Sequence, residues 1–323
     1  PMEAPAPKQV SWGAFLPLYA VRSARNWGAG DLGDMEAVRK WIEDLGGGVV
    51  ATLPLLAANE DEPSPYSPVS RLFWNELYLD LERLPEWSDE LRDEAKISAL
   101  RRSDQVDYEG VTATRRLALE VMARRFHPGD DFHRFASSGG YGYAHFRAAR
   151  EERESAGYHL YVQYRMAQQM RELASSTDLY LDFPLGVNPE GYDAWKYSRS
   201  FAKGVSVGAP PDSFFTKGQN WGFPPFDPDS IREQRYDYFR AAIRHHVSHA
   251  AILRLDHVMG LHRLFWIPEG LEPKDGVYVR YREEELYAIV VLEARRHDCA
   301  IVGEDLGTVP EYVPRMMLRH GLR

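Results

Sequence analysis

The stretch Ala250–Pro268, which reads AAILRLDHVMGLHRLFWIP, decides the expected fold. Its apolar start leads into Arg254-Leu255-Asp256-His257, and a glycine turn follows. Because successive side chains of a strand point to opposite faces, Arg254 and Asp256 share one face. This pattern suits a barrel strand, with one face toward the barrel axis and the other against covering helices. A carboxylate at the end of such a strand lies at the C-terminal rim, where these folds carry out chemistry.

Taken alone, Arg254 and Asp256 are explained equally well as a structural ion pair. A second segment, Asp298–Pro310 (DCAIVGEDLGTVP), favours chemistry, because it is again an apolar run that ends in carboxylates, Glu304 and Asp305. Two consecutive strands that end in axis-facing carboxylates would supply the acid–nucleophile pair of glycoside chemistry.

Composition excludes several classes of function. The chain has 323 residues and a formal net charge of -9, which argues against a nucleic-acid or anionic-membrane surface. The single cysteine, Cys299, cannot form an internal disulfide, and this fits a reducing cytoplasm. The N-terminus lacks the basic and apolar regions of a signal peptide, and no apolar run approaches membrane-spanning length.

Alternation of apolar runs with helical patterns predicts an α/β chain with a parallel sheet covered by helices. The five expected strands are Trp12–Val21, Val49–Leu56, Asp178–Val187, Ala251–Asp256 and Cys299–Glu304. The expected helices include Met35–Leu45, Ser230–His249 and Glu283–Arg296. Residues 1–11 are expected to be a linker remnant and residues 12–323 a partial catalytic barrel, with residues 84–173 as a charged helical insertion or subdomain.

Two motifs suggest other chemistries, and their context argues against both. Gly28-Ala29-Gly30-Asp31-Leu32-Gly33 matches G-x-G-x-x-G, but about five polar or aromatic residues separate it from the preceding strand, and the fingerprint needs a tight strand–turn–helix unit. His245 and His249 have the i, i+4 spacing of metal ligands, without the glutamate of an HExxH motif. They are therefore interpreted as surface histidines, and neither a metal nor a cofactor is predicted.

Two loops carry aromatic side chains suited to a sugar site. In Ser64-Pro65-Tyr66-Ser67-Pro68 the prolines fix the backbone, so Tyr66 is either a preorganised sugar platform or a tyrosine packed in a turn. Val207–Pro228 (VGAPPDSFFTKGQNWGFPPFDP) is expected to line a site and not to form a core element.

In chain order, these segments resemble the 4-α-glucanotransferases (amylomaltases) of glycoside hydrolase family 77. Val207–Pro228 is similar to the long acceptor-side loop of the family. Arg254–His257 resembles its nucleophile strand, and Gly303-Glu304-Asp305-Leu306-Gly307 resembles its acid/base strand. The matching pieces of the acceptor-side loop are Pro210-Pro211-Asp212, Phe214 and Gly218-Gln219-Asn220-Trp221-Gly222, and Ser64–Pro68, Asp182-Phe183-Pro184 and Trp27–Gly33 also fall in family order.

The resemblance implies a (β/α)8 barrel in which the five predicted strands are the first five. Asp256 would be the nucleophile that forms a covalent β-glucosyl-enzyme, and Glu304 would be the general acid and then the general base. Their carboxyl groups are expected to lie about 5–5.5 Å apart, as in retaining enzymes. Arg254 would keep Asp256 ionised and oriented.

The resemblance also implies a set of groups that bind an α-1,4-glucan or maltooligosaccharide. Tyr66 and Trp221 would border glucose rings, and Gln219 and Asp182 would bind hydroxyl groups. Asp212, His257 and Asp305 complete the predicted substrate-binding set.

This sequence departs from the family pattern in two ways. Ser213 and Phe223 stand where the family often has tyrosine and asparagine. The third essential carboxylate of the family, near the seventh strand, has no counterpart before Arg323. The chain is therefore expected to be a piece of a longer product, poorly active or inactive unless another chain or a further C-terminal segment completes the barrel. Two alternatives stay open: a retaining α-glucan hydrolase of the α-amylase clan, and an inactive glucan-binding fragment in which Asp256 and Glu304 are structural.

Overall fold

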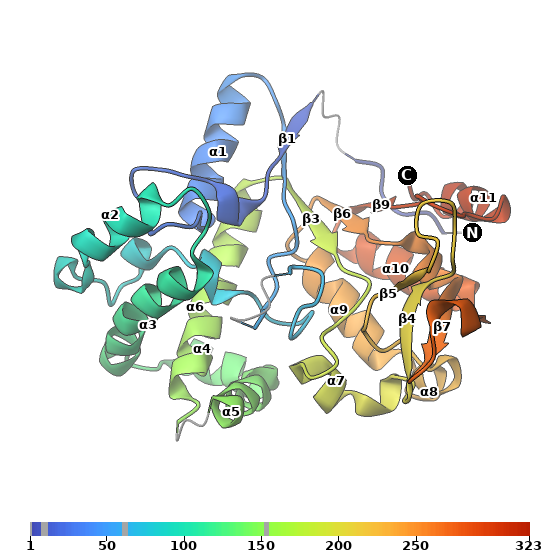
Figure 1. Cartoon of the computed structure of the whole chain (residues 1–323). Helices are drawn as coiled ribbons and strands as arrows, with labels where there is room; N and C mark the ends of the chain where they lie inside the picture. The colour runs from blue at the N-terminus through green and yellow to red at the C-terminus, as the bar shows by residue number, and fades with distance from the viewer. Residues whose placement is uncertain (1, 8–11, 60–63, 152–154) are drawn as a thin grey trace. The chain divides into compact units, whose positions relative to one another are not determined.

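A computed structural model of the chain describes residues 2–7, 12–59, 64–151 and 155–323 (Figure 1). The chain divides into two compact units, each assembled from separate stretches of sequence. The first unit comprises Pro1–Gln9, Ser64–Leu72 and Tyr180–Arg323, and the second comprises Val10–Pro63 and Phe73–Leu179.

Three parallel strands form the centre of the first unit. They are β3 (Leu179–Phe183), β6 (Ile252–Leu255) and β9 (Ala300–Gly303), in the order β3-β6-β9. In their register Asp182 lies opposite Arg254, and Leu255 lies opposite Gly303. Because the strands run in the same direction, the residues that follow β6 and β9 emerge at the same end of the sheet.

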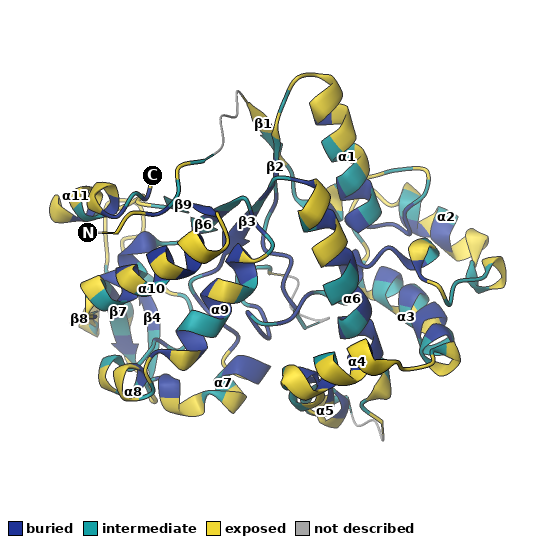
Figure 2. Ribbon diagram, turned by 180° about the vertical axis from the view of Figure 1, so that it is seen from behind, coloured by how far each residue is buried: buried dark blue, intermediate teal, exposed yellow. Residues whose placement is uncertain are grey.

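Helices α9 (Asp237–Val247) and α10 (Glu283–Arg296) pack against each other in the first unit, and α9 also contacts β6. Both helices have one buried and one exposed face (Figure 2), the amphipathic pattern of a covering helix. The expected helix Ser230–His249 is in fact two helices, α8 (Pro228–Glu233) and α9. The break comes at Arg235 and Tyr236, which adopt left-handed backbone angles although neither is glycine, so no residue pattern indicates it.

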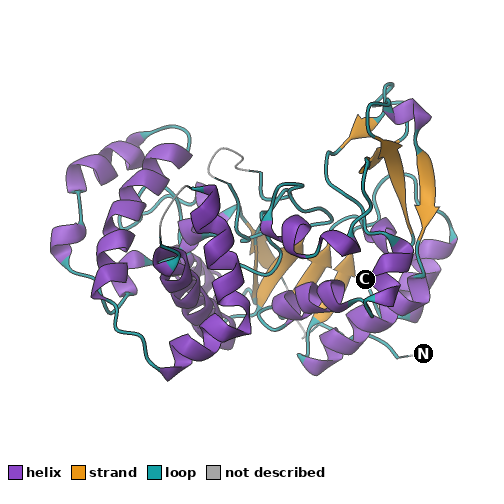
Figure 3. Cartoon of the chain, turned by 90° about the horizontal axis from the view of Figure 1, so that it is seen from below, coloured by secondary structure: helices purple, strands orange, loops and turns teal. Residues whose placement is uncertain are grey.

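A second sheet of the first unit is antiparallel and contains strands that the sequence interpretation missed (Figure 3). Its order is β5-β4-β7-β8. The predicted loop Val207–Pro228 contains most of β4 and all of β5, so the expectation that it forms no core element is wrong, and Val207 is fully buried. The strands are β4 (Val205–Ala209), β5 (Gln219–Asn220), β7 (Arg263–Pro268) and β8 (Val277–Arg280).

The second unit combines a short parallel strand pair with most of the helices. Both strands are shorter than expected, because Pro17 and Pro54 follow closely and proline has no N–H for a strand ladder. Within the described residues, the charged segment 84–173 consists mainly of helices. The elements of the second unit are β1 (Gly13–Phe15), β2 (Val49–Ala51), α1 (Leu32–Asp44), α2 (Glu94–Arg102), α3 (Tyr108–Arg125), α4 (Asp130–Phe135), α5 (Tyr141–Arg150) and α6 (Gly157–Ser176). The first unit also contains the helices α7 (Tyr192–Lys196) and α11 (Tyr312–Arg319).

The glycine-rich motif of the second unit is part of a helix start. Asp31 caps α1, and its carboxylate and that of Asp34 each accept the backbone N–H of the other residue. A Cβ added at Gly30 would lie 2.2 Å from the carbonyl oxygen of Leu18, and one added at Gly33 would lie 2.2 Å from Asp80 Oδ2. The spacing of these two glycines is therefore explained by close packing, in agreement with the rejection of a dinucleotide site.

The predicted linker, residues 1–11, lies partly outside the described residues. Within the described part, Ala4 is buried, and its N–H donates to the carbonyl oxygen of His320 at 2.8 Å. No helix in the described ranges is long and apolar enough to cross a membrane.

Candidate active site

Arg254 links the carboxylates of Asp182 and Asp256. The register of β3 and β6 places Asp182 opposite Arg254. Arg254 Nη1 lies 2.8 Å from Asp182 Oδ1, and Arg254 Nη2 lies 2.9 Å from Asp256 Oδ1. The side chain of Asp182 is 6% exposed, whereas that of Asp256 is 24% exposed. Asp256 is therefore the carboxylate of the pair that a molecule from solvent can reach.

Burial and charge act in opposite directions on these groups. Burial raises the pKa of the Asp256 carboxyl above its ordinary value, the Arg254 guanidinium opposes this, and the charge of Glu304 raises it further. Burial likewise raises the pKa of Asp182, again opposed by Arg254. Burial lowers the pKa of Arg254 itself, but Asp182 and Asp256 outweigh this effect and raise it overall. The arginine therefore stays charged and favours the ionised form of both carboxylates.

Tyr66 joins this cluster through its hydroxyl group, which donates to Asp182 Oδ2 at 2.8 Å. Burial, followed by the charge of Asp182 and this hydrogen bond, raises the pKa of the phenol, so it stays protonated as a donor. The residues Tyr66, Asp182, Arg254 and Asp256 thus form a continuous chain of polar contacts.

Glu304 is held next to Asp256 by backbone N–H groups. Its Oε2 accepts the N–H of His257 at 2.9 Å, and its Oε1 accepts the N–H of Leu306 at 2.7 Å. The backbone N–H of Glu304 donates to the carbonyl oxygen of Leu255. His257, the residue after Asp256, adopts a left-handed backbone with φ 51°. That conformation directs its N–H to the Glu304 carboxylate.

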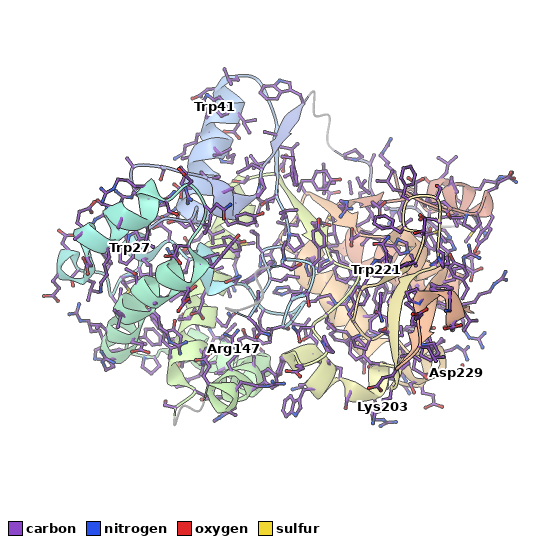
Figure 4. The ribbon with its side chains drawn as sticks, viewed as in Figure 1. Trp27, Trp41, Arg147, Lys203, Trp221 and Asp229 are labelled. Carbon is purple, nitrogen blue, oxygen red and sulfur yellow. The ribbon has the colours of Figure 1, made fainter. Side chains whose placement is uncertain are left out.

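Trp221, labelled in Figure 4, packs against His257, which lies two residues after β6. Its ring meets the His257 ring edge to face, with 5.3 Å between the ring centroids. Its Nε1 donates to Gln219 Oε1 at 3.3 Å. The structure therefore brings three predicted substrate-binding residues, Gln219, Trp221 and His257, beside the polar chain that contains Asp256.

The two other predicted residues lie on exposed loops. Asp212 Oδ1 accepts the N–H groups of Phe214 and Phe215, at 2.8 Å and 2.6 Å, and so closes the turn of its own loop. This turn presents Phe214, which is 89% exposed. Asp305 follows Glu304 directly and is exposed.

Sequence reasoning missed a buried arginine beside the site. Arg71 is 2% exposed, and it lines a mainly apolar cavity of about 50 Å³ together with Phe183, Asp256 and His257. The only signal was its position, a charged residue inside the otherwise apolar and small-residue run Pro68–Trp74. Among the described residues, no group of three or more His, Cys, Asp or Glu side chains is arranged to hold a metal ion.

Comparison with known proteins identifies relatives of the chain that carries these carboxylates. A family model described as 4-alpha-glucanotransferase, glycoside hydrolase family 77, matches residues 16–157 and 143–323. The chain is 35% identical to a 4-alpha-glucanotransferase of Mycobacterium tuberculosis over 97% of its length, which is 51% of the relative. It is 30% identical to a 4-alpha-glucanotransferase of Haemophilus influenzae over 94% of its length and 53% of the relative.

Two solved structures share the fold. The amylomaltase of Corynebacterium glutamicum matches 96% of this chain and 49% of its own, with a TM-score of 0.88 and 29% identity. The amylomaltase of Streptococcus agalactiae, solved in complex with acarbose, matches 96% of this chain and 71% of its own, with a TM-score of 0.82 and 21% identity.

Paired carboxylates at the ends of adjacent parallel strands are suited to glycoside chemistry. The chain belongs to glycoside hydrolase family 77, the 4-alpha-glucanotransferase family. The predicted α/β fold of the (β/α)8-barrel family is confirmed. The chain spans about half the length of the curated relatives that it matches.

Proposed function

We propose that this chain carries the nucleophile and the acid/base of a 4-α-glucanotransferase, which moves α-1,4-glucan segments to the 4-hydroxyl of acceptor glucans by a retaining double displacement. The observation that carries the proposal is the pairing of Asp256 and Glu304 within a family 77 chain. The two residues follow neighbouring parallel strands, and the N–H of His257 joins the end of one strand to the carboxylate of the other.

The first step breaks the glycosidic bond of the donor. An Asp256 carboxylate oxygen attacks C1 of the donor glucose while protonated Glu304 gives its proton to the departing glycosidic oxygen. A covalent β-glucosyl-enzyme forms, and the shortened glucan leaves as an alcohol. Arg254 orients Asp256, since its Nη2 lies 2.9 Å from Oδ1 of that carboxylate.

The second step restores the enzyme. The Glu304 carboxylate removes the proton from the 4-hydroxyl of an acceptor, the acceptor oxygen attacks C1, and Asp256 departs as a carboxylate. Two inversions at C1 give net retention of the α configuration. The predicted carboxyl separation of about 5–5.5 Å, which this order of events requires, stays a prediction.

The remaining residues bind the sugar rings in this proposal. Trp221 offers an aromatic edge and face beside His257, and Gln219 offers an amide to hydroxyl groups. Asp182 fixes Arg254 and Tyr66, and it takes part in sugar binding from that fixed position. Asp212 and Asp305 are assigned to the outer, exposed part of the glucan path.

We place the reaction in the cytoplasm, in keeping with the buried lone thiol of Cys299. The substrate class is maltooligosaccharides and longer α-1,4-glucans. That a further C-terminal segment completes the barrel stays a prediction.

The deciding experiment is incubation of the chain with maltotriose, with the products resolved by chain length. Transfer yields glucose together with oligosaccharides longer than maltotriose. Glu304→Gln should remove both products, because a carboxamide neither donates nor accepts the required proton. Glu311→Gln is the matched control: its side chain is 95% exposed, and the products should be unchanged.

Other product patterns would contradict the proposal. Glucose and maltose without longer products would indicate hydrolysis. Bound maltotriose with no products at all, even after the predicted C-terminal segment has been added to the chain, would indicate a glucan-binding fragment.

A further inference from the structure

We propose that Arg71 is a positioning residue that fixes Tyr66 on Asp182, and through this contact sets the orientation of Arg254 and the nucleophile Asp256. The inference concerns the loop 64–72, which enters the first unit from a distant part of the sequence. Its consequence for the reaction rate rests on the proposed function, whereas its structural part does not.

The Arg71 guanidinium is enclosed by aromatic rings and carbonyl groups. Its central carbon lies 5.0 Å from the centroid of the Phe183 ring, 5.3 Å from that of Phe226 and 5.2 Å from that of Tyr238. Nη1 donates to the carbonyl oxygens of Pro184 and Leu185, at 3.3 Å and 3.1 Å. These two carbonyls directly follow β3, the strand that carries Asp182.

A buried aspartate balances this buried charge. Asp193 is fully buried, and its carboxylate accepts the Ser70 hydroxyl at 2.6 Å, the Arg71 backbone N–H at 2.7 Å and the Tyr238 hydroxyl at 2.6 Å. Arg71 Nε donates to the same Tyr238 hydroxyl at 3.0 Å. Arg71 is therefore linked to Asp193 in two ways. Its backbone N–H donates to the carboxylate, and its side chain reaches the carboxylate through the Tyr238 hydroxyl.

The geometry of the loop follows from this network. The carbonyl of Pro68 accepts the N–H of Asn188 at 2.9 Å, and that of Val69 accepts the N–H of Asp193 at 3.3 Å. With Ser70 and Arg71 held as well, four consecutive residues are fixed on the segment that follows β3. Tyr66 lies two residues before this anchored run, so its hydroxyl has little freedom to leave Asp182.

The choice of arginine has a physical reason. A guanidinium presents five donors in one plane, and this plane serves two carbonyls and a hydroxyl while lying between aromatic rings. A lysine in this place would keep the charge, but its compact ammonium cannot reproduce the planar arrangement. Arg71→Lys is therefore the informative change, because it keeps the charge and removes the geometry.

The structural part is tested by NMR on protein labelled with carbon-13 at the tyrosine Cζ. The signal that disappears in Tyr66→Phe is the signal of Tyr66 among the 18 tyrosines. In Arg71→Lys we expect this signal to shift and broaden toward that of an exposed tyrosine. Arg232→Lys, a change at a half-exposed arginine of the same unit, should leave it unmoved. An unmoved Tyr66 signal in Arg71→Lys would overturn the inference.

The catalytic part is tested by a double-mutant cycle with maltotriose. Arg71→Lys should lower kcat about 2- to 10-fold with little change of KM, no more than the loss of the Tyr66 hydroxyl itself would cost. In the Tyr66→Phe background the same change should cost less than about twofold, since its effect passes through the Tyr66 hydroxyl. A general loss of folding would lower activity equally in both backgrounds, and that result would overturn the inference. A further outcome is that Arg71→Lys moves the Tyr66 signal while the wild-type chain forms no glucans longer than maltotriose. In that case the proposed function fails and the positioning role stands.

Discussion

Each of the two units contains an arginine that gathers aspartates, and the two clusters serve different ends. In the second unit, Arg25 contacts Asp31 at 2.6 Å, Asp34 at 3.4 Å and Asp80 at 2.6 Å, and all three carboxylates are at most 3% exposed. In the first unit, Arg254 contacts Asp182 and Asp256, and Asp256 remains 24% exposed.

The partners of the carboxylates explain the difference. Asp31 and Asp34 accept backbone N–H groups at the start of α1, and Asn26 also donates to Asp34. These bonds stabilise a helix terminus, and they bury the carboxylates among groups of the same unit. One carboxylate oxygen of Asp256, Oδ1, contacts Arg254, and the residue lies at a strand end beside Glu304. The same residue types thus form a buried, stabilising ion-pair network when all carboxylates are enclosed. They form a candidate reaction centre when one carboxylate is left accessible.

The largest expected effect separates the two clusters by activity. Asp256→Asn removes the attacking oxygen, so we expect the transfer rate to fall by about 10⁴-fold or more. Thermal unfolding of the variant should stay close to that of the wild type, because Arg254 keeps its contact with Asp182. Initial rates with maltotriose and a melting curve test both statements, and a substantial residual rate would assign the nucleophile to another residue.

For the buried cluster around Arg25, we expect a loss of stability without a loss of activity. Asp34→Asn disrupts the capping box and leaves Arg25 with fewer charged partners, at a cost of about 2–4 kcal/mol in the free energy of unfolding. The kcat of the folded variant should equal that of the wild type, since Asp34 only supports the start of α1. Urea unfolding measures the cost. A stable variant with a reduced kcat would place this cluster in the catalytic machinery after all.

The pH dependence of stability sharpens the comparison. Burial, together with the charges of Asp80 and Asp34, raises the pKa of Asp31 to about 6. The folded chain then binds this proton more tightly than the unfolded chain, so the stabilisation is present at low pH and is lost as the pH rises through about 4 to 6. We expect a loss of about 1–3 kcal/mol across this window in the wild type.

The control for this pH effect is Asp31→Asn, which cannot ionise. Its free energy of unfolding, measured in urea at each pH, should fall less steeply than that of the wild type over the same range. Parallel curves for the two proteins would show that other groups cause the dependence.

The smallest effect is expected for Tyr66→Phe. The change removes the hydroxyl that donates to Asp182 and keeps the ring, so it should cost about 0.5–1.5 kcal/mol in transition-state stabilisation. The ratio of kcat/KM for the two proteins with maltotriose gives this value directly. A Tyr66→Phe variant with a raised KM and an unchanged kcat would instead assign the hydroxyl to substrate binding, since the ring is kept.

Much of the first unit could be predicted from residue patterns. Apolar runs located β3, β6 and β9, and two-residue alternation placed Arg254 and Asp256 on one face, where they form the ion pair. β4 and β5 were missed because they are short and lie in a segment rich in glycine and proline, whereas β7 and β8 have no such interruption and were not assigned. At Gly208, for example, a Cβ would lie 2.0 Å from the carbonyl oxygen of Gln219, so glycine is there for close strand pairing and not for a loop.

Long-range contacts were beyond the reach of sequence patterns. Asp193 lies more than a hundred residues from Arg71, and no local spacing connects them. The environment of Tyr66 likewise depends on Asp182, which the sequence separates from it by an equally long stretch. Burial and charge balance, which decide both cases, are properties of the assembled unit.

The backbone bonds between β6 and β9 also bear on how such a chain can change over evolutionary time. His257 and Glu304 are joined by an N–H group of one and a carboxylate of the other, with Glu304 bonded back to Leu255. A slip of one residue in either strand would turn its carboxylate to the opposite face. Insertions and deletions should therefore accumulate in the turn at residues 269–276, and be excluded from the two strands and the single residues that follow them.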